Sequence, residues 1–213
     1  MADRHAIGRS AHRSGGGFEH EVSKNFSEWY GKDDSFYRTP GSGSHHWAES
    51  MNVMGDVVSD PTIGFKYLIE CKRYNGWTIE NLLRGNNHFP SWFAQAVREG
   101  EDNNKVPLLV YKRPRSDTFV TMPYEPYLAK KLDPIIVQNL SFSADHLAKE
   151  KHTPTKAKIM TTTLPEFLKN NFDYLQNKCY KSDWKKQVVY KVNKEAVKES
   201  PESLVDKEMN KIG

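Results

Sequence analysis

Residues 54–72, MGDVVSDPTIGFKYLIECK, carry Asp56 near their start and Glu70 and Lys72 at their end. The second half of this segment, from Phe65 to Lys72, has the apolar and aromatic content of a strand and follows a turn marked by Pro and Gly. Alternate side chains of a strand share one face, so Glu70 and Lys72 should point the same way. Burying either charge alone would be costly, so the two must neutralise each other or serve a third group.

A second carboxylate, that of Asp56, is expected near Glu70. The run from Val53 to Val58 predicts a strand antiparallel to the one carrying Glu70, which would bring the two carboxylates close together. Carboxylates so placed repel each other unless a cation lies between them. Mg²⁺, with Mn²⁺ as a substitute, is satisfied by one or two carboxylates, waters and phosphate oxygens. Such an ion would polarise a phosphodiester and acidify a bound water, and Lys72 would orient that water or stabilise the developing charge. A plain structural ion pair of Glu70 with Lys72 is the alternative reading.

Regular elements must hold these residues in place. Phe18, Val22, Phe26 and Trp29 recur at helical spacing behind the flexible lead Ser14–Gly17. The later elements are predicted as strands at 36–38, 53–58, 65–72, 106–112 and 117–122, a helical turn at 78–83 and a helix at 90–99 that stops before Gly100. This order predicts an α/β fold with a mixed sheet.

The spacing of Gly55-Asp56, thirteen further residues and Glu70-Cys71-Lys72 resembles the PD-(D/E)XK nuclease signature, with Gly in place of the usual Pro. A glutamate-bearing helix and an arginine-ended strand precede it. Over residues 15–122 the chain therefore resembles archaeal-type Holliday-junction resolvases and their phage relatives. The resemblance implies a restriction-endonuclease-like core, with a central mixed sheet flanked by helices. It also implies metal ligation by Asp56, Glu70, Glu19 and the main-chain carbonyl of Cys71, while Lys72 positions the attacking water.

The same resemblance places DNA-contacting residues around the site. Arg38 and Ser42 would meet DNA phosphate. Gln95 would face the site from the following helix, and Lys112 would be the basic residue of the next strand. Arg73, at the exit of the hairpin, adds positive charge there. DNA is the expected partner, branched DNA such as a Holliday junction the preferred substrate, and symmetrical cutting of two strands would need a homodimer.

The composition limits the class of protein. The 213 residues carry a formal net charge of +4, a pI of about 8.9 and a mean hydropathy of −0.76, which suit a soluble protein with a phosphate-bearing partner. No run of about 18 apolar residues could span a membrane, and the start of the chain lacks the apolar segment of a signal peptide. Cys71 and Cys179 are too far apart for a disulfide framework or a zinc pair. We expect a cytoplasmic protein of a prokaryotic or phage-infected cell.

The chain is expected to have four parts. They are a flexible basic N-terminus (1–14), the nuclease core (15–122), an extension packed on the core (123–181) and a charged tail (182–213). Within the extension, Pro134–Gln138 is strand-like and Leu164–Leu175 predicts a helix, whereas Thr153–Thr163 is polar and predicts no element.

Two other functions fit the same residues. A restriction or repair nuclease acting on linear duplex DNA would keep the site and use residues 123–213 for target recognition. A DNA-binding protein of the same fold would have lost catalysis, and the intact signature argues against that. In the Gly/Ser loop, His45 and His46 are more typical of solvated residues than of a transition-metal site. Trp77, Trp92 and Phe93 belong in the core or stack on unpaired bases.

Overall fold

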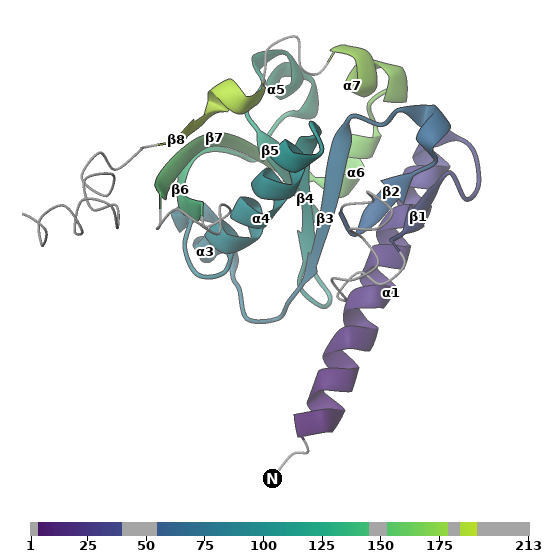
Figure 1. The fold of residues 1–213 in the computed structure, drawn as a ribbon, viewed down its shortest axis with the longest axis vertical. Helices are drawn as coiled ribbons and strands as arrows, with labels where there is room; N and C mark the ends of the chain where they lie inside the picture. The colour runs from purple at the N-terminus through teal and green to yellow at the C-terminus, as the bar shows by residue number, and fades with distance from the viewer. Residues whose placement is uncertain (1–3, 40–54, 145–152, 179–183, 191–213) are drawn as a thin grey trace, which may run out of the picture.

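The computed structural model describes residues 4–39, 55–144, 153–178 and 184–190, with side chains described from Gly16 onward. Within them the chain forms one mixed sheet flanked by helices, which confirms the predicted α/β class (Figure 1). The strands are β1 Phe36–Arg38, β2 Val57–Ser59, β3 Tyr67–Arg73, β4 Val106–Lys112, β5 Phe119–Pro123, β6 Ile136–Ala144, β7 Thr153–Thr163 and β8 Val188–Tyr190. The helices are α1 Arg4–Tyr30, α3 Ile79–Arg84, α4 Phe89–Asp102, α5 Pro126–Leu132, α6 Leu164–Leu168 and α7 Phe172–Lys178, with 3-10 turns at Pro61–Ile63 and Trp184–Gln187.

The strand order across the sheet is β1-β2-β3-β4-β5-β7-β6, and β8 also pairs with β7. Strands β3 and β4 run parallel, with Glu70 opposite Leu109 and Lys72 opposite Tyr111, whereas the other recorded pairs are antiparallel. Parallel neighbours need a crossover connection, which α3 and α4 supply. This crossover brings α4 back over the strand that carries the signature.

Helices cover both faces of the sheet. On one face α1 packs against β1, β2 and β3, and its buried Phe26 lies near Phe167 of α6. On the other face α4 packs against β3, β4 and β6 (Figure 1). Tyr67 of β3 faces the α1 side, because its ring lies near that of Phe167. Lys72, five residues further along the strand, faces α4.

Helix α1 begins earlier than the sequence indicates. We predicted a flexible lead and a helix from Phe18, but the helix starts at Arg4 and includes the three glycines at 15–17. Each glycine costs a helix about 1 kcal/mol relative to alanine, which weakens a helix without forbidding it. The N-terminal half of α1 therefore projects well beyond the sheet (Figure 1).

Strand β7 occupies residues 153–163, for which we predicted no element. Residues 153–161 of β7 pair with β6, and the other edge of β7 pairs with β5 and β8. The buried threonines are satisfied locally, since the Thr161 hydroxyl lies 2.7 Å from that of Thr121 and Thr162 donates to the carbonyl of Leu132. Strands β6 and β7, which belong to the expected extension (123–181), thus continue the central sheet.

Two further boundaries differ from the prediction. The segment 164–175 forms two helices instead of one, with the break at Asn170, whose carbonyl accepts a hydrogen bond from the indole of Trp29 at 2.7 Å. Gly100 lies inside α4, where a Cβ would come within 2.8 Å of the carbonyl oxygen of Lys105. Close packing on the next strand therefore accounts for this glycine better than helix termination does.

Candidate active site

Strand β3 carries the two charged residues of the signature into the centre of the fold. Glu70 is 2% exposed, and its Oε1 accepts a hydrogen bond from Lys72 Nζ at 2.5 Å. The Lys72 side chain is 24% exposed, so it is more accessible than its partner Glu70. The ion pair that the strand alternation predicted is therefore present.

Asp56 lies where β2 separates from β3. Its backbone N–H donates to the carbonyl of Ile69 at 2.9 Å, and its Oδ2 accepts from the backbone N–H of Cys71 at 2.8 Å. The Asp56 side chain thus accepts the hydrogen bond of a β3 backbone N–H, as a backbone carbonyl of a neighbouring strand would. Fixing one oxygen on the backbone leaves Asp56 Oδ1 available to another partner.

Gly55 allows this approach. It has φ of +92°, and a Cβ there would lie 2.9 Å from the carbonyl oxygen of Ile69. Proline, the usual residue of the signature, has φ near −65° and does not fit this backbone. The glycine that replaces the usual proline of the signature therefore fits the backbone at position 55.

Burial and neighbouring charge govern the titration of the site. Burial raises the pKa of Asp56 to about 6, opposed by the Cys71 N–H and supported by the charge of Glu19. Burial, and then the nearby Asp56 carboxylate, raise the pKa of Glu70 well above its usual value. Burial lowers the pKa of Lys72, but Glu70 and its hydrogen bond outweigh this effect and leave the pKa above its usual value. Lys72 therefore stays charged, and the two carboxylates are poised to gain from a cation.

Two side chains of helix α4 extend the hydrogen-bond network of Lys72. Gln95 Oε1 accepts from Lys72 Nζ at 3.0 Å, and Gln95 Nε2 donates to Glu99 Oε1 at 2.9 Å. Gln95 was predicted to face the site. Glu99 was not, although its position four residues after Gln95 puts both on one face of a helix. The negative charge of Glu99 also raises the pKa of Asp56, Glu70 and Lys72, behind other causes in each case.

Helix α1 pairs its acids with two cations that we predicted to meet DNA. Glu19 forms an ion pair with Arg38 Nε, and Glu21 accepts from Lys112 Nζ at 2.6 Å through Oε1. Lys112 also lies over the ring of Phe18, 5.2 Å from its centroid. Sequence reasoning missed Glu21, whose partner lies 91 residues away.

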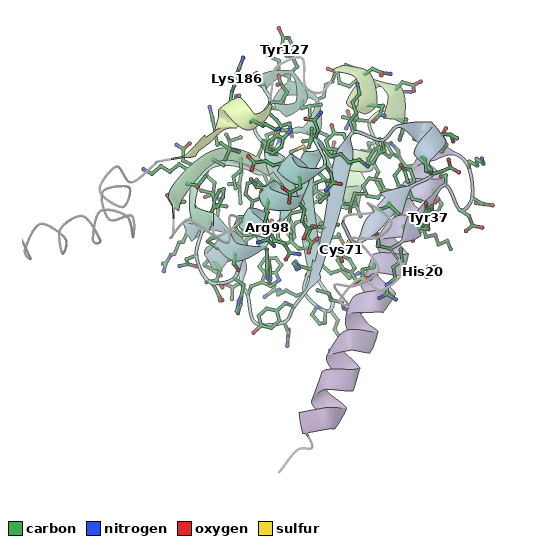
Figure 2. All side chains as sticks on the ribbon, in the orientation of Figure 1. His20, Tyr37, Cys71, Arg98, Tyr127 and Lys186 are labelled. Carbon is green, nitrogen blue, oxygen red and sulfur yellow. The ribbon has the colours of Figure 1, made fainter. Side chains whose placement is uncertain are left out.

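The other predicted residues take different places. Arg73 is exposed at the end of β3, and Cys71 is a buried free thiol whose pKa is raised well above its usual value, first by burial and then by Asp56. Figure 2 places Cys71 near the centre of the molecule, with Arg98 of α4 to one side and His20 of α1 to the other. Trp77 and Phe93 are buried in the core, whereas Trp92 is half-buried. Predictions for Ser42, His45, His46 and Cys179 concern positions outside the described residues.

The donor set fits a hard divalent cation held by two acids. In the described part of the chain, no three His, Cys, Asp or Glu side chains are grouped so as to hold a metal. Glu19, predicted as a third ligand, forms an ion pair with Arg38, and its charge raises the pKa of Asp56. Asp56 and Glu70 offer only oxygen donors, and the charge of Asp56 raises the pKa of the buried Glu70. Two carboxylates with waters and phosphate oxygens suffice for Mg²⁺.

The sheet order, the flanking helices and the Asp56, Glu70 and Lys72 arrangement define the PD-(D/E)XK nuclease class. A family model described as phage putative PDDEXK endonuclease matches residues 10–177, and the chain belongs to this family. The match crosses residue 122, so the family includes strands β6 and β7.

One curated protein and no solved structure match the chain. Protein D14 of Escherichia phage T5 is 34% identical over 89 residues, which cover 40% of this chain and 54% of that protein. The match thus spans about half the length of the curated relative. No solved structure matches. In the described ranges no helix has both the length and the apolar character needed to cross a membrane.

Proposed function

We propose that the protein is a Mg²⁺-dependent endonuclease that hydrolyses DNA phosphodiesters. The observation that carries the proposal is the Asp56 carboxylate, held by the Cys71 N–H near the buried Glu70, with the Lys72 ammonium beside Glu70. A structural ion pair explains Glu70 and Lys72 but leaves no reason for a second carboxylate, Asp56, whose charge opposes that of Glu70. Membership of the endonuclease family supports the same conclusion.

Asp56 and Glu70 would hold the cation through their carboxylate oxygens. The bound cation supplies a Lewis acid for the phosphoryl oxygen and an acidified water as nucleophile. The backbone N–H of Cys71 fixes the Asp56 carboxylate, so that it does not turn away from Glu70. Burial keeps bulk water from Glu70 and strengthens its interaction with charge.

Lys72 orients the nucleophile and stabilises the charge that develops on the phosphate. Its ammonium has three donors, of which Glu70 and Gln95 occupy two. The third donor remains for the water or the phosphate oxygen. The ammonium therefore enters the reaction with its position already set.

Glu99 sets the orientation of Gln95 and so acts on Lys72 indirectly. An ionised carboxylate only accepts hydrogen bonds, so it selects the amide rotamer in which Nε2 faces Glu99 and Oε1 faces the lysine. The opposite rotamer would put donors against the ammonium. The proposed chain therefore runs from Glu99 through Gln95 and Lys72 to Glu70.

We propose branched DNA, such as a four-way junction, as the preferred substrate and a homodimer as the active form. Both proposals derive from the resemblance to junction resolvases, since symmetrical incision needs two sites related by a twofold axis. Arg38, Arg73 and Lys112 are proposed to contact DNA phosphate, as cations of β1, β3 and β4 around the acidic pair.

Cleavage assays with matched substrates test the proposal. A labelled four-way junction, a linear duplex with the same arms and a single strand are incubated with the full chain and Mg²⁺, and with EDTA as a control. We expect Mg²⁺-dependent incision with the junction cut fastest. Lys72→Ala should abolish incision while DNA binding, measured with Ca²⁺ present, stays near the parent value. Absence of any incision by the parent protein overturns the proposal, and equal rates on junction and duplex favour a nuclease of linear DNA.

A further inference from the structure

An exposed aromatic cluster borders the candidate site at the exit of β3. The ring of Tyr74 lies 4.8 Å from that of His88 and 6.1 Å from that of Trp92, both at near-perpendicular angles. His88 in turn stacks on Trp92, with centroids 5.9 Å apart and planes at 14°. Tyr74 is 44% exposed, so one part of the cluster faces solvent. We call Tyr74, His88 and Trp92 the aromatic platform.

The aromatic platform lies next to the Lys72–Gln95 contact, further along β3 and nearer the start of α4. Lys72 meets Gln95 of α4, and Tyr74, two residues further along, meets Trp92, three residues earlier on the same helix. Two strand residues advance about 6.6 Å, and one helical turn about 5.4 Å, so facing positions stay matched. Side chains two apart in extended chain share a face, so Tyr74, just past the end of β3, lies on the α4 side together with Lys72.

The Tyr74 ring is held in place. A Cβ on Gly76 would lie 2.5 to 2.6 Å from Cε1, Cζ and the hydroxyl oxygen of Tyr74, so the ring lies directly against the Gly76 backbone. The side chain of Asn87 donates to the Gly76 carbonyl at 3.0 Å, and the backbone N–H of Tyr74 donates to the Lys112 carbonyl at 3.2 Å. A fixed, exposed ring loses little conformational entropy when it binds a flat partner.

Two arginines adjoin the Tyr74 segment of the platform along the backbone. Arg73 directly precedes Tyr74, and Arg113 directly follows Lys112, to which the Tyr74 backbone is bonded. Glu80 is an acid of the neighbouring helix α3, and part of the lowering of its pKa comes from Arg113, after its hydrogen bonds. A flat ring flanked by arginines suits a partner with flat faces joined by phosphates.

We propose that the aromatic platform stacks on an unpaired base of the DNA next to the phosphate that is cut. This inference rests on the proposed nuclease function and names its substrate class, namely DNA in which a base near the scissile phosphate is unstacked, as at a branch or bulge. Base stacking on an aromatic ring contributes about 1–3 kcal/mol and tolerates any base, so the platform selects DNA shape without reading sequence. Paired duplex offers no such base and gains nothing from Tyr74.

Binding of fluorescent DNA tests the proposal without requiring cleavage. Two duplexes of the same sequence carry 2-aminopurine, either unpaired in a single-base bulge or paired, and are titrated with the full chain in Ca²⁺. For the parent protein we expect tighter binding of the bulged duplex and quenching of its fluorescence. Tyr74→Ala should weaken that binding about tenfold and remove the quenching, because about 1.4 kcal/mol corresponds to a factor of ten. Binding of the paired duplex should change less than twofold.

Three further variants separate stacking from other effects. Tyr74→Phe should retain quenching, since stacking needs the ring and not the hydroxyl. Gly76→Ala should reduce it by displacing the Tyr74 ring. Tyr127→Ala, at a tyrosine of α5 that is 60% exposed, is the matched control and should behave as the parent. Equal preference for the bulged duplex in the parent and Tyr74→Ala would overturn the proposal. A parent that quenches 2-aminopurine but cuts no DNA would support the platform and refute the nuclease function.

Discussion

The backbone N–H of Cys71 donates to the carboxylate of Asp56 at 2.8 Å, so the two halves of the signature are joined by a hydrogen bond before any ligand arrives. Burial raises the pKa of Asp56 and this bond lowers it, so the amide compensates part of the cost of placing the acid inside the protein. A substitution that keeps this hydrogen bond but removes the charge can therefore distinguish a structural role of Asp56 from a chemical one.

Asp56→Asn tests the chemical role. The Asn amide oxygen can accept from the Cys71 N–H, so the fold should persist, but a neutral ligand should lower Mg²⁺-dependent cleavage by about 100-fold or more. Asp56→Ala should lose cleavage and also about 1–3 kcal/mol of unfolding free energy, because the Cys71 amide loses its partner. Cleavage is measured at saturating Mg²⁺ and unfolding in urea. Parent-like cleavage by Asp56→Asn would remove this residue from the mechanism.

Stability should fall with rising pH in the absence of metal. The pKa of Asp56 is about 6 when folded, against 3.8 as the reference value, so between these pH values the folded state binds more protons than the unfolded state. The unfolding free energy contributed by this group therefore decreases from pH 4 to pH 6, by at most about 3 kcal/mol, and stays low above pH 6.

Urea unfolding of the parent and Asp56→Asn in EDTA, from pH 4 to pH 8, measures this loss. The difference in unfolding free energy between the two proteins should change from pH 4 to pH 6. Adding Mg²⁺ should raise the melting temperature more at pH 8 than at pH 5, since protonated acids do not bind it. A melting temperature that responds to Mg²⁺ equally at both pH values would contradict the assigned ligands.

A double-mutant cycle tests the chain from Glu99 to Lys72. Gln95→Ala and Glu99→Ala should each lower the cleavage rate constant about tenfold, with little change in DNA affinity. If Glu99 acts only through Gln95, the double variant should be no slower than Gln95→Ala alone. Asp102→Asn, at an exposed acid of the same helix, is the matched control. Additive losses would instead show that Glu99 acts on the reaction directly.

A readout independent of cleavage is the NMR signal of the Lys72 ammonium, assigned through its absence in Lys72→Arg. In the parent and in Asp102→Asn, the two hydrogen bonds should slow its exchange with water. Glu99→Ala should speed that exchange by releasing Gln95. An unchanged Lys72 signal in Glu99→Ala would argue against positioning.

The sequence predicted those contacts of the site that join residues close together in the chain. The alternation of β3 predicted the pairing of Glu70 with Lys72, and strand β4 was predicted with the bounds that the structure gives it. The long-range part was not predictable, because nothing local indicates that Glu21 meets Lys112 or that β7 enters the sheet between β5 and β6. Threonine-rich β7 was missed since its hydroxyls are satisfied by neighbours that only the fold brings together.

The ion pair of Arg38 with Glu19 should limit the contribution of this arginine to DNA binding. Arg38→Ala should weaken binding modestly and reduce the slope of log affinity against log salt by at most about 1. Glu19→Gln removes the negative charge that pairs with the guanidinium and should tighten binding, with a steeper salt dependence. Affinity for a four-way junction, measured in Ca²⁺ at several salt concentrations, checks both variants. Lys24→Ala, at an exposed cation of α1, is the control.

Gly55→Ala should be one of the most damaging single substitutions near the site. It combines an unfavourable positive φ with a Cβ only 2.9 Å from the Ile69 carbonyl oxygen, which is backbone and has little freedom to move. We expect a loss of about 2–4 kcal/mol of unfolding free energy and of cleavage, since Asp56 would be displaced from Cys71. Gly31→Ala is the matched control, because Gly31 has φ of +84° and no atom near its Cβ position. It should show only the conformational cost of about 1 kcal/mol. Equal losses in the two variants, measured by urea unfolding, would mean that the contact with Ile69 contributes nothing.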